Sequence, residues 1–285
     1  MRWFVEVNTN EELEAATEEA RRTNTPVVLI AGGSNVLVAD DGWDGLVIVN
    51  RIRGIEIEGN DVRARAGTRW DEVVDAANEA GLSGLECTAG IPGTVGGMVY
   101  GNAGAYGQSV SDKLSGVQVL KDGKIYDVTK EESEFGYRES RFKTSGEIIL
   151  EAEWKLDSGS REQLEKRTEE IRNARLEKFP PGLCCPGSFF KNLIAADLPE
   201  STVQMIPPEK IIGGKVPAGY LLEQVGAKGR QRGAAKVTDF HANILENTGG
   251  AKASDIWALA TELKEDVKKK FGIELEPEVQ IIGKV

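Results

Sequence analysis

Histidine and cysteine, which serve many enzymes as bases, nucleophiles or metal ligands, are scarce in this chain. His241 is the only histidine among 285 residues, so a Ser–His–Asp triad or a histidine-rich metal site would have to use it. The three cysteines, Cys87, Cys184 and Cys185, have neither the even number of a disulfide framework nor the spacing of a zinc finger. We therefore expect no metal site, and chemistry that depends on a cofactor or on other side chains.

The segment at residues 90–107 contains seven glycines and is the most unusual part of the sequence. This density predicts an irregular loop with no helix or strand. Ordering such a loop costs chain entropy, a cost that makes sense if a flat or elongated ligand lies against its backbone. A mobile surface loop is the alternative, and we favour the ligand-binding interpretation.

A second motif, Gly32-Gly33-Ser34-Asn35, follows the apolar run at residues 27–30, which predicts a buried strand. Glycines let backbone N–H groups converge on an anion without obstruction by Cβ atoms, and Ser34 and Asn35 add side-chain donors. Taken alone, the motif favours a simple tight turn.

The common nucleotide-binding motifs are absent. No two glycines stand two positions apart, so the G-x-G-x-x-G fingerprint cannot occur. The Gly-Lys pairs at 123–124 and 214–215 are not followed by Ser or Thr, which excludes a P-loop. A dinucleotide, if bound, must be held by another scaffold.

Periodicity and turn signals predict a chain of mixed helices and strands. Thr9 to Glu12 resembles a capping box for a helix through about Arg22. Asp122-Gly123 predicts a hairpin. Further helices are expected at 70–80, 161–178 and 254–271, and strands at 2–7, 27–30, 36–38, 46–49, 55–58, 62–66, 117–120, 125–128, 148–156 and 279–282.

The composition excludes some classes of partner. Basic and acidic residues give a net charge of 35 − 46 = −11, which disfavours nucleic acid and anionic membranes as main partners. The first residues lack the apolar stretch of a signal peptide, and no apolar run approaches the ~20 residues that span a bilayer. With the cysteine pattern, this predicts a cytoplasmic protein.

Five motifs occur in an order that resembles one family. They are IAGGSNVLVAD at 30–40, GIPGTVGGMVYGNAGAYG at 90–107, YRESRFK at 137–143, GSFFKN at 187–192 and LEPEVQIIG at 275–283. The chain resembles the UDP-N-acetylenolpyruvoylglucosamine reductases, the MurB family, over nearly its whole length. Only 50 residues separate Arg138 from Ser188, so it resembles the shorter subclass, which lacks a tyrosine-bearing loop.

The resemblance implies an α+β fold. A two-subdomain FAD-binding region of the vanillyl-alcohol-oxidase (PCMH) type is expected at 1–157, with subdomains at about 1–66 and 67–157. A linker helix and an α+β substrate domain should follow at 158–273, and a strand at 274–285 should return to the active site. The protein is expected to be a monomer.

The resemblance implies non-covalent FAD as cofactor and NADPH as co-substrate. By analogy, the flavin pyrophosphate should lie on the first glycine motif and the rest of the flavin along the second. The residues expected to hold the cofactor are Gly32, Gly33, Ser34, Asn35, Gly90, Ile91, Pro92, Gly93, Gly96, Gly97, Asn102, Gly104 and Ala105.

The resemblance also implies a reaction, the reduction of UDP-N-acetylglucosamine enolpyruvate to UDP-N-acetylmuramate for peptidoglycan synthesis. Hydride reaches C3 of the enolpyruvyl group and a proton reaches C2. The matching catalytic residues are Arg138 for the carboxylate, Ser188 as proton donor and Glu278 as an orienting carboxylate. The alternatives are a surface arginine, a turn serine and a solvent-exposed carboxylate.

The resemblance further implies a set of substrate contacts. The expected residues are Tyr137, Lys191, Asn192, Lys228 and His241, with Arg230 as a further cation for the diphosphate. For the basic residues, an ordinary solvated role is an equal alternative. Two other functions stay open for the chain: a different FAD-dependent oxidoreductase of the same fold, or an inactive flavin-binding protein.

Overall fold

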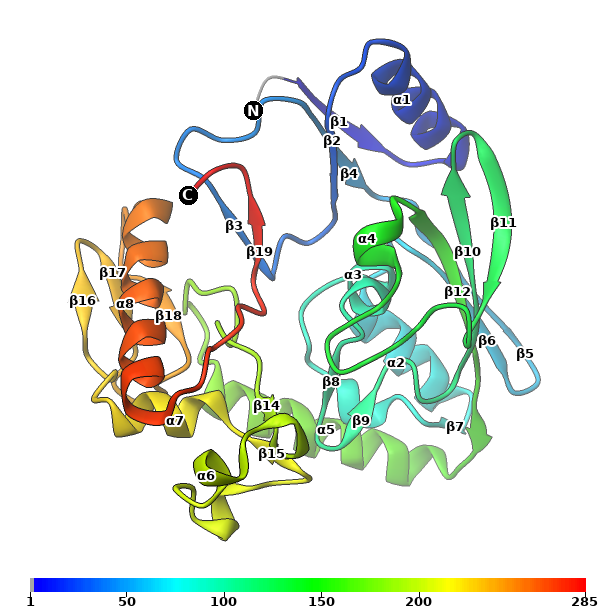
Figure 1. The fold of residues 1–285 in the computed structure, drawn as a ribbon. Coiled ribbons are helices and arrows are strands. Elements are labelled where there is room, and N and C mark those ends of the chain that lie inside the picture. The colour runs from blue at the N-terminus through cyan, green and yellow to red at the C-terminus, as the bar shows by residue number, and fades with distance from the viewer. Residues whose placement is uncertain (1–2) are drawn as a thin grey trace. The chain divides into compact units, whose positions relative to one another are not determined.

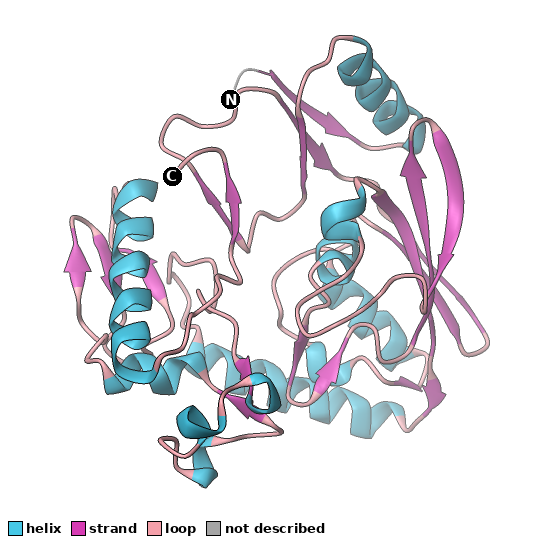
Figure 2. Ribbon diagram, in the orientation of Figure 1, coloured by secondary structure: helices cyan, strands magenta, loops and turns pink. Residues whose placement is uncertain are grey.

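The computed structural model describes residues 3–285, and the chain forms two compact units (Figure 1). The first, termed here the N-terminal unit, runs to Gly33 and resumes over Asp44–Glu177. The second, the C-terminal unit, comprises Ser34–Trp43 and Lys178–Val285. Both units contain helices and strands, which confirms the predicted α+β class (Figure 2).

A three-stranded parallel sheet opens the N-terminal unit in the order β1-β4-β2. The strands are β1 (Trp3–Val7), β2 (Val27–Ile30) and β4 (Leu46–Asn50), and the helix α1 (Asn10–Arg22) connects β1 to β2. The Thr9 side chain accepts a hydrogen bond from the Glu12 N–H at 3.2 Å, so the predicted cap of α1 is confirmed. Because the strands are parallel, the loop with Gly32 and Gly33 leaves the sheet at the same edge as the ends of β1 and β4.

An antiparallel sheet of five strands follows in the order β11-β10-β12-β6-β5. The strands are β5 (Ile55–Glu58), β6 (Asp61–Arg65), β10 (Leu114–Lys121), β11 (Lys124–Thr129) and β12 (Ile148–Lys155). Asp122 and Gly123 both have positive φ, 52° and 72°, which is the type I′ geometry of a two-residue hairpin. The predicted hairpin is therefore confirmed.

Helices α2 (Trp70–Glu79) and α5 (Arg161–Lys178) share one core with this sheet. Trp70 meets Trp154 of β12 edge to face, with ring centroids 5.4 Å apart. The Asn78 amide of α2 donates to the Thr168 hydroxyl of α5 at 2.8 Å in a buried hydrogen bond. These contacts place nearly all of α5 in the N-terminal unit.

The compact units differ from the expected domain ranges at two points. The N-terminal unit extends to Glu177, beyond the expected boundary at 157, because α5 packs on α2. The segment Ser34–Trp43 belongs to the C-terminal unit, because its strand pairs there. The functional division into 1–157, 158–273 and 274–285 stays a prediction.

The glycine-rich segment contains regular structure, so our expectation of an irregular loop was wrong. It includes the helix α3 (Val95–Tyr100) and the strand β8 (Gly104–Ala105), which pairs with β9 (Gln108–Ser109). The glycines allow close packing: a Cβ atom on Gly96 would lie 3.1 Å from the Cβ of Ala66. The apolar residues between the glycines are buried and hold the short helix in place.

The C-terminal unit is built around one long helix. Its main elements are β3 (Val36–Val38), α7 (Ala218–Gln224), β16 (Gln231–Arg232), β17 (Ala235–Val237), β18 (Leu245–Asn247), α8 (Ala253–Phe271) and β19 (Gln280–Ile282). β19 pairs in parallel with β3. The Asp40 carboxylate accepts hydrogen bonds from the N–H groups of Ala253 and Ser254 at 2.7 and 3.2 Å, which caps α8 and attaches Ser34–Trp43 to this unit.

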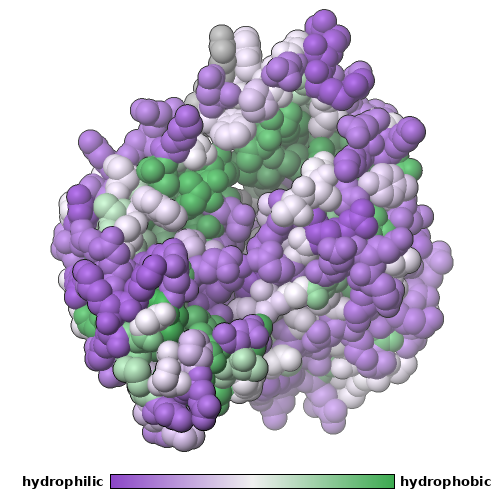
Figure 3. Space-filling model, viewed as in Figure 1, coloured by the Kyte–Doolittle hydropathy of each residue, from purple (hydrophilic) through white to green (hydrophobic). Residues whose placement is uncertain are grey.

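The remaining elements are short. They are β7 (Leu82–Ser83), β13 (Asp157–Ser158), β14 (Leu193–Ile194), β15 (Lys215–Val216), α4 (Phe142–Ser145), α6 (Glu200–Val203) and three 3-10 helices at Glu86–Thr88, Ala195–Asp197 and Pro208–Lys210. Hydrophilic residues cover most of the surface visible in Figure 3. Within residues 3–285, no helix is long and apolar enough to cross a bilayer.

A buried carboxylate fixes the turn that follows the YRESRFK motif. The Glu147 side chain is 1% exposed. It accepts hydrogen bonds from Arg141 Nε at 3.0 Å, Ser145 Oγ at 2.6 Å and Tyr126 Oη at 2.7 Å. Burial by itself would raise the pKa of Glu147, but these hydrogen bonds outweigh burial and lower the pKa to about 2.

Acidification is expected to remove the stability that Glu147 contributes. Its pKa is about 2 in the folded protein against an ordinary value of 4.5, so the contribution is complete above the ordinary pKa and disappears as the pH falls through the folded one. Glu147→Gln should lower the free energy of unfolding at neutral pH by about 2–3 kcal/mol. Urea denaturation of both proteins at neutral and acidic pH measures the difference, which should shrink in acid.

Candidate functional site

The two glycine motifs approach each other within the N-terminal unit. A Cβ atom on Gly32 would lie 3.7 Å from the Cα of Gly93, and Gly33 has a left-handed backbone with φ of 65°. Of the thirteen residues predicted to hold the cofactor, eleven lie in the N-terminal unit, whereas Ser34 and Asn35 lie in the C-terminal unit. The structure therefore divides the Gly-Gly-Ser-Asn motif between the two units.

Two features of the second motif fit a bound cofactor. Thr94 is 7% exposed, and its hydroxyl oxygen is buried with no hydrogen-bond partner in the described chain. Gly97 on α3 is exposed, and a Cβ atom added there would meet no atom within 4 Å. A flavin lying along this segment could form a hydrogen bond with the Thr94 hydroxyl and pack against the exposed backbone at Gly97.

Arg138 docks onto the same glycine-rich segment. Its guanidinium donates from Nη2 to the Gly104 carbonyl at 2.6 Å and from Nη1 to the Asn102 carbonyl at 3.5 Å. Its Cζ atom lies 5.1 Å from the centre of the Tyr137 ring. Asn102 in turn donates its amide to the Gly136 carbonyl at 2.8 Å, so the two segments hold each other. Arg138 is thus fixed beside residues predicted to bind the flavin.

Arg175 on α5 is a candidate that the sequence reasoning missed. Its Nε donates to the Gly90 carbonyl at 2.9 Å. Burial lowers the pKa of Arg175, Tyr106 and Asp71 oppose this, and the charge of Arg138 lowers the pKa further. A second guanidinium therefore lies near the first. Helical periodicity predicted α5 but gave no signal that one of its several arginines supports the glycine-rich segment.

In the C-terminal unit, the segments of Ser188 and Glu278 lie side by side. The Glu278 N–H donates to the carbonyl of Phe189, the residue after Ser188, at 2.8 Å. The Asn35 amide donates to the Glu278 carbonyl at 3.1 Å. Ser188 and Glu278 are both half-buried. The structure thus brings together two predicted catalytic residues and one predicted cofactor residue, while Arg138 and Tyr137 belong to the N-terminal unit.

The predicted substrate residues of the C-terminal unit already have protein partners. Lys191 is 8% exposed and pairs with Glu276 at 2.6 Å. The Asn192 side chain accepts from the Ala218 N–H at 3.1 Å. Two further pairs are Lys228 with Glu223 at 2.6 Å and Arg230 with Asp266 at 2.6 Å. Any anion at these cations must therefore compete with a carboxylate.

His241 is neutral at physiological pH. Burial lowers its pKa to about 4, and the charges of Lys178 and Lys228 act in the same direction against the opposing effect of Glu223. Its Nδ1 accepts a hydrogen bond from the Asn243 N–H at 3.1 Å, so the proton of the neutral ring must be on Nε2. His241 can therefore donate one hydrogen bond from Nε2 without adding charge.

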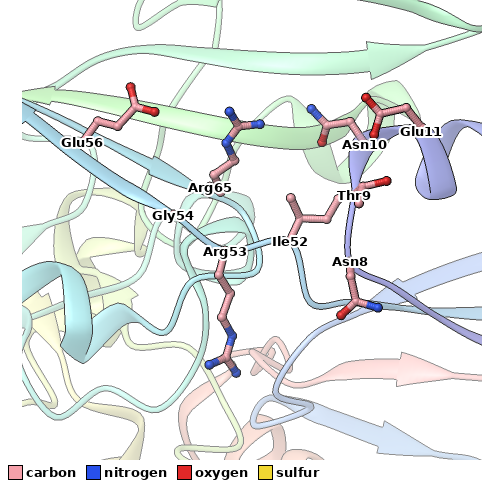
Figure 4. A pocket seen from close by; sticks show the side chains of 9 residues that line it. All are labelled: Asn8, Thr9, Asn10, Glu11, Ile52, Arg53, Gly54, Glu56 and Arg65. Carbon is pink, nitrogen blue, oxygen red and sulfur yellow. The ribbon is translucent and has the colours of Figure 1, made fainter.

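A separate polar cavity of about 340 Å³ lies in the N-terminal unit at the carboxyl ends of β1 and β4 (Figure 4). None of the residues predicted to be functional lines it; the lining residues are Asn8, Thr9, Asn10, Glu11, Ile52, Arg53, Gly54, Glu56 and Arg65. Its two arginines have carboxylate neighbours, Arg65 with Glu151 at 3.3 Å and Arg53 with Glu72 at 3.9 Å. We assign no ligand to this cavity.

Comparison with known sequence families first defines a class. Residues 1–129 match the family described as FAD binding domain, which is the part of the chain that carries both glycine motifs. Residues 180–282 match the C-terminal domain of UDP-N-acetylenolpyruvoylglucosamine reductase. The chain is a flavin-dependent oxidoreductase with a separate C-terminal domain.

Similarity to individual proteins identifies the family. The chain is 42% identical to the UDP-N-acetylenolpyruvoylglucosamine reductase of Solibacter usitatus over 98% of its length and 90% of the relative. It is 38% identical to that of a Synechococcus strain, over 99% and 85%. The crystal structure of the Thermus caldophilus reductase (MurB) matches with a TM-score of 0.78 and 32% identity, covering 98% of this chain and 92% of that one. The chain belongs to the UDP-N-acetylenolpyruvoylglucosamine reductase family.

Gly97→Ala should separate cofactor binding from folding. The added methyl group meets no protein atom within 4 Å, and alanine favours a helix over glycine, so thermal stability without FAD should be kept. If FAD lies against this backbone, its affinity should fall about tenfold. Flavin fluorescence titration measures the affinity. Gly116→Ala, whose Cβ would meet only the Val128 carbonyl at 3.6 Å, is the control, and equal affinities in both variants would contradict the assignment.

Proposed function

We propose that this chain catalyses the NADPH-dependent reduction of UDP-N-acetylglucosamine enolpyruvate to UDP-N-acetylmuramate, with non-covalently bound FAD as cofactor. The observation that carries this proposal is the hydrogen bond from the Glu278 N–H to the Phe189 carbonyl, which brings the segments of Glu278 and Ser188 together. The glycine segments at 32–35 and 90–105 hold the cofactor, chiefly through backbone N–H groups and the Thr94 hydroxyl. When bound, FAD supplies the hydride that it receives from NADPH.

Arg138 binds the substrate carboxylate and stabilises the negative charge that develops when hydride reaches C3. Its planar guanidinium can meet both carboxylate oxygens, and its contacts with the Asn102 and Gly104 carbonyls hold it beside the cofactor segment. Because these donors are fixed before the substrate arrives, little reorganisation is needed during the reaction.

Ser188 donates the proton that C2 receives, and the Glu278 carboxylate orients Arg138 or a water molecule that relays a proton. An ordinary hydroxyl can serve as a general acid where the developing carbanion is strongly basic and the geometry is fixed. The backbone bonds around Phe189 and Glu278 supply that fixed geometry. Hydride at C3 and a proton at C2 together complete the reduction of the double bond.

The substrate domain supports recognition of the UDP-sugar. We propose that Tyr137, Lys191, Asn192, Lys228 and His241 contact the substrate. The neutral His241 provides a hydrogen-bond donor, and the lysines provide charge for the diphosphate. We further propose that the protein acts as a monomer in the cytoplasm, where the free state of Cys87, Cys184 and Cys185 fits a reducing compartment.

The function can be tested by visible spectroscopy. The purified protein loaded with FAD should lose its flavin absorbance when NADPH is added without oxygen. UDP-N-acetylglucosamine enolpyruvate should then restore the absorbance and yield one UDP-N-acetylmuramate per flavin reoxidised. Bleaching by NADPH followed by reoxidation with oxygen but not with the enolpyruvyl sugar would assign the chain a different oxidase or dehydrogenase activity.

Ser188→Ala should separate the two half-reactions. Loss of the hydroxyl leaves the reduction of FAD by NADPH unchanged but should slow reoxidation by the enolpyruvyl sugar by about a hundredfold or more, the usual range for a lost general acid. Stopped-flow absorbance measures each half-reaction. Ser201→Ala, at an exposed position in α6, is the control. Equal slowing of both half-reactions in Ser188→Ala would contradict the proton-donor role.

A further inference from the structure

Arg138 has a backbone conformation that long side chains seldom adopt. Its φ is 58°, in the left-handed region where the Cβ atom is crowded by the neighbouring peptide. Residues are kept in this region only where the surrounding structure holds them there. The direction in which the Arg138 guanidinium leaves the turn therefore depends on contacts made by its own main chain.

Lys143 makes such a contact. Its ammonium group donates to the carbonyl oxygen of Arg138 at 2.6 Å and to the Glu139 carboxylate at 3.2 Å. The Lys143 side chain is 14% exposed, so water competes weakly for these donors. A charge-assisted hydrogen bond of this kind is stronger than a bond between neutral groups.

The helix that carries Lys143 is itself firmly held. Lys143 lies in α4, next to Phe142, which is 2% exposed and packs edge to face against Phe135 with ring centroids 6.3 Å apart. On its other side, Arg141 is bonded to the buried Glu147. The Lys143 ammonium group therefore extends to the Arg138 carbonyl from a helix, α4, whose position is fixed by the packing of Phe142.

We propose that Lys143 is a positioning residue for the substrate carboxylate: it holds the left-handed main chain of Arg138, so that the guanidinium is directed onto the Asn102 and Gly104 carbonyls and toward the reacting group. This inference rests on the proposed function, because it takes Arg138 as the group that binds the carboxylate. Lys143 acts through Arg138 and does not itself touch the substrate.

The alternative is that Lys143 only stabilises the fold. A structural role would lower stability and affect all ligands alike, whereas a positioning role affects only ligands that use the Arg138 guanidinium. UDP-N-acetylmuramate carries the carboxylate, and UDP-N-acetylglucosamine has the same nucleotide and sugar without it. The ratio of the two affinities therefore separates the roles.

The experiment measures both affinities by calorimetry on the FAD-loaded full-length chain. In Lys143→Met, binding of UDP-N-acetylmuramate should weaken about tenfold or more, while binding of UDP-N-acetylglucosamine should change by less than about twofold. Lys143→Arg keeps charge and donors and should recover much of the lost affinity. The rate of flavin reoxidation by the enolpyruvyl sugar should fall by up to about a hundredfold in Lys143→Met, with the NADPH half-reaction unchanged.

Lys130→Met is the matched control, because Lys130 also donates to a backbone carbonyl, that of Asp112 at 2.9 Å, but on an exposed turn. It should leave both affinities unchanged. If Lys143→Met does not fold, the ratio of the two affinities is measured on Lys143→Gln instead. A ratio equal to that of the wild-type protein, which includes an equal loss for both ligands, overturns the positioning role. Failure of the wild-type enzyme to reduce the enolpyruvyl sugar would instead refute the proposed function.

Discussion

The parallel pairing of β19 with β3 is the constraint on which the C-terminal unit depends. The Gln280 N–H donates to the Asn35 carbonyl at 3.0 Å, and the Asn35 amide donates to the Glu278 carbonyl across 243 positions of sequence. The same terminal segment bonds to Phe189 through the Glu278 N–H. This pairing therefore holds Ser34 and Asn35, the second half of the first glycine motif, next to the segments that carry Ser188 and Glu278.

In the N-terminal unit, the glycine-rich segment has two connected roles. Its carbonyls accept hydrogen bonds from Arg138 at Asn102 and Gly104 and from Arg175 at Gly90. Its exposed face at Gly97 and the buried Thr94 hydroxyl fit the cofactor. Because the segment proposed to bind the flavin also accepts hydrogen bonds from the guanidinium, the position of the proposed electrophile is coupled to that of the proposed cofactor site.

The motifs and local patterns of the sequence indicated the family, the FAD-binding class and several local structures. The cap at Thr9 and the hairpin at 122–123 are local signals, set by a few neighbouring residues, and the structure confirms both. The helix at Val95–Tyr100 was missed because glycine counts predict a loop, whereas packing against Ala66 makes the glycines favourable. The packing of α5 on α2 was not predicted, because only a few positions of α5 are buried.

The sequence alone determined which chemical groups the protein has: one histidine, no Rossmann fingerprint, and motifs that supply an arginine, a serine and a carboxylate in a family-specific order. Only the tertiary structure decided how those groups are held. The bond from Lys143 to the left-handed Arg138 and the approach of Asn35 to Glu278 are absent from any local pattern. Motifs give residue types along the chain. Which distant segments become neighbours, and so which backbone groups pair between them, is determined by the tertiary fold.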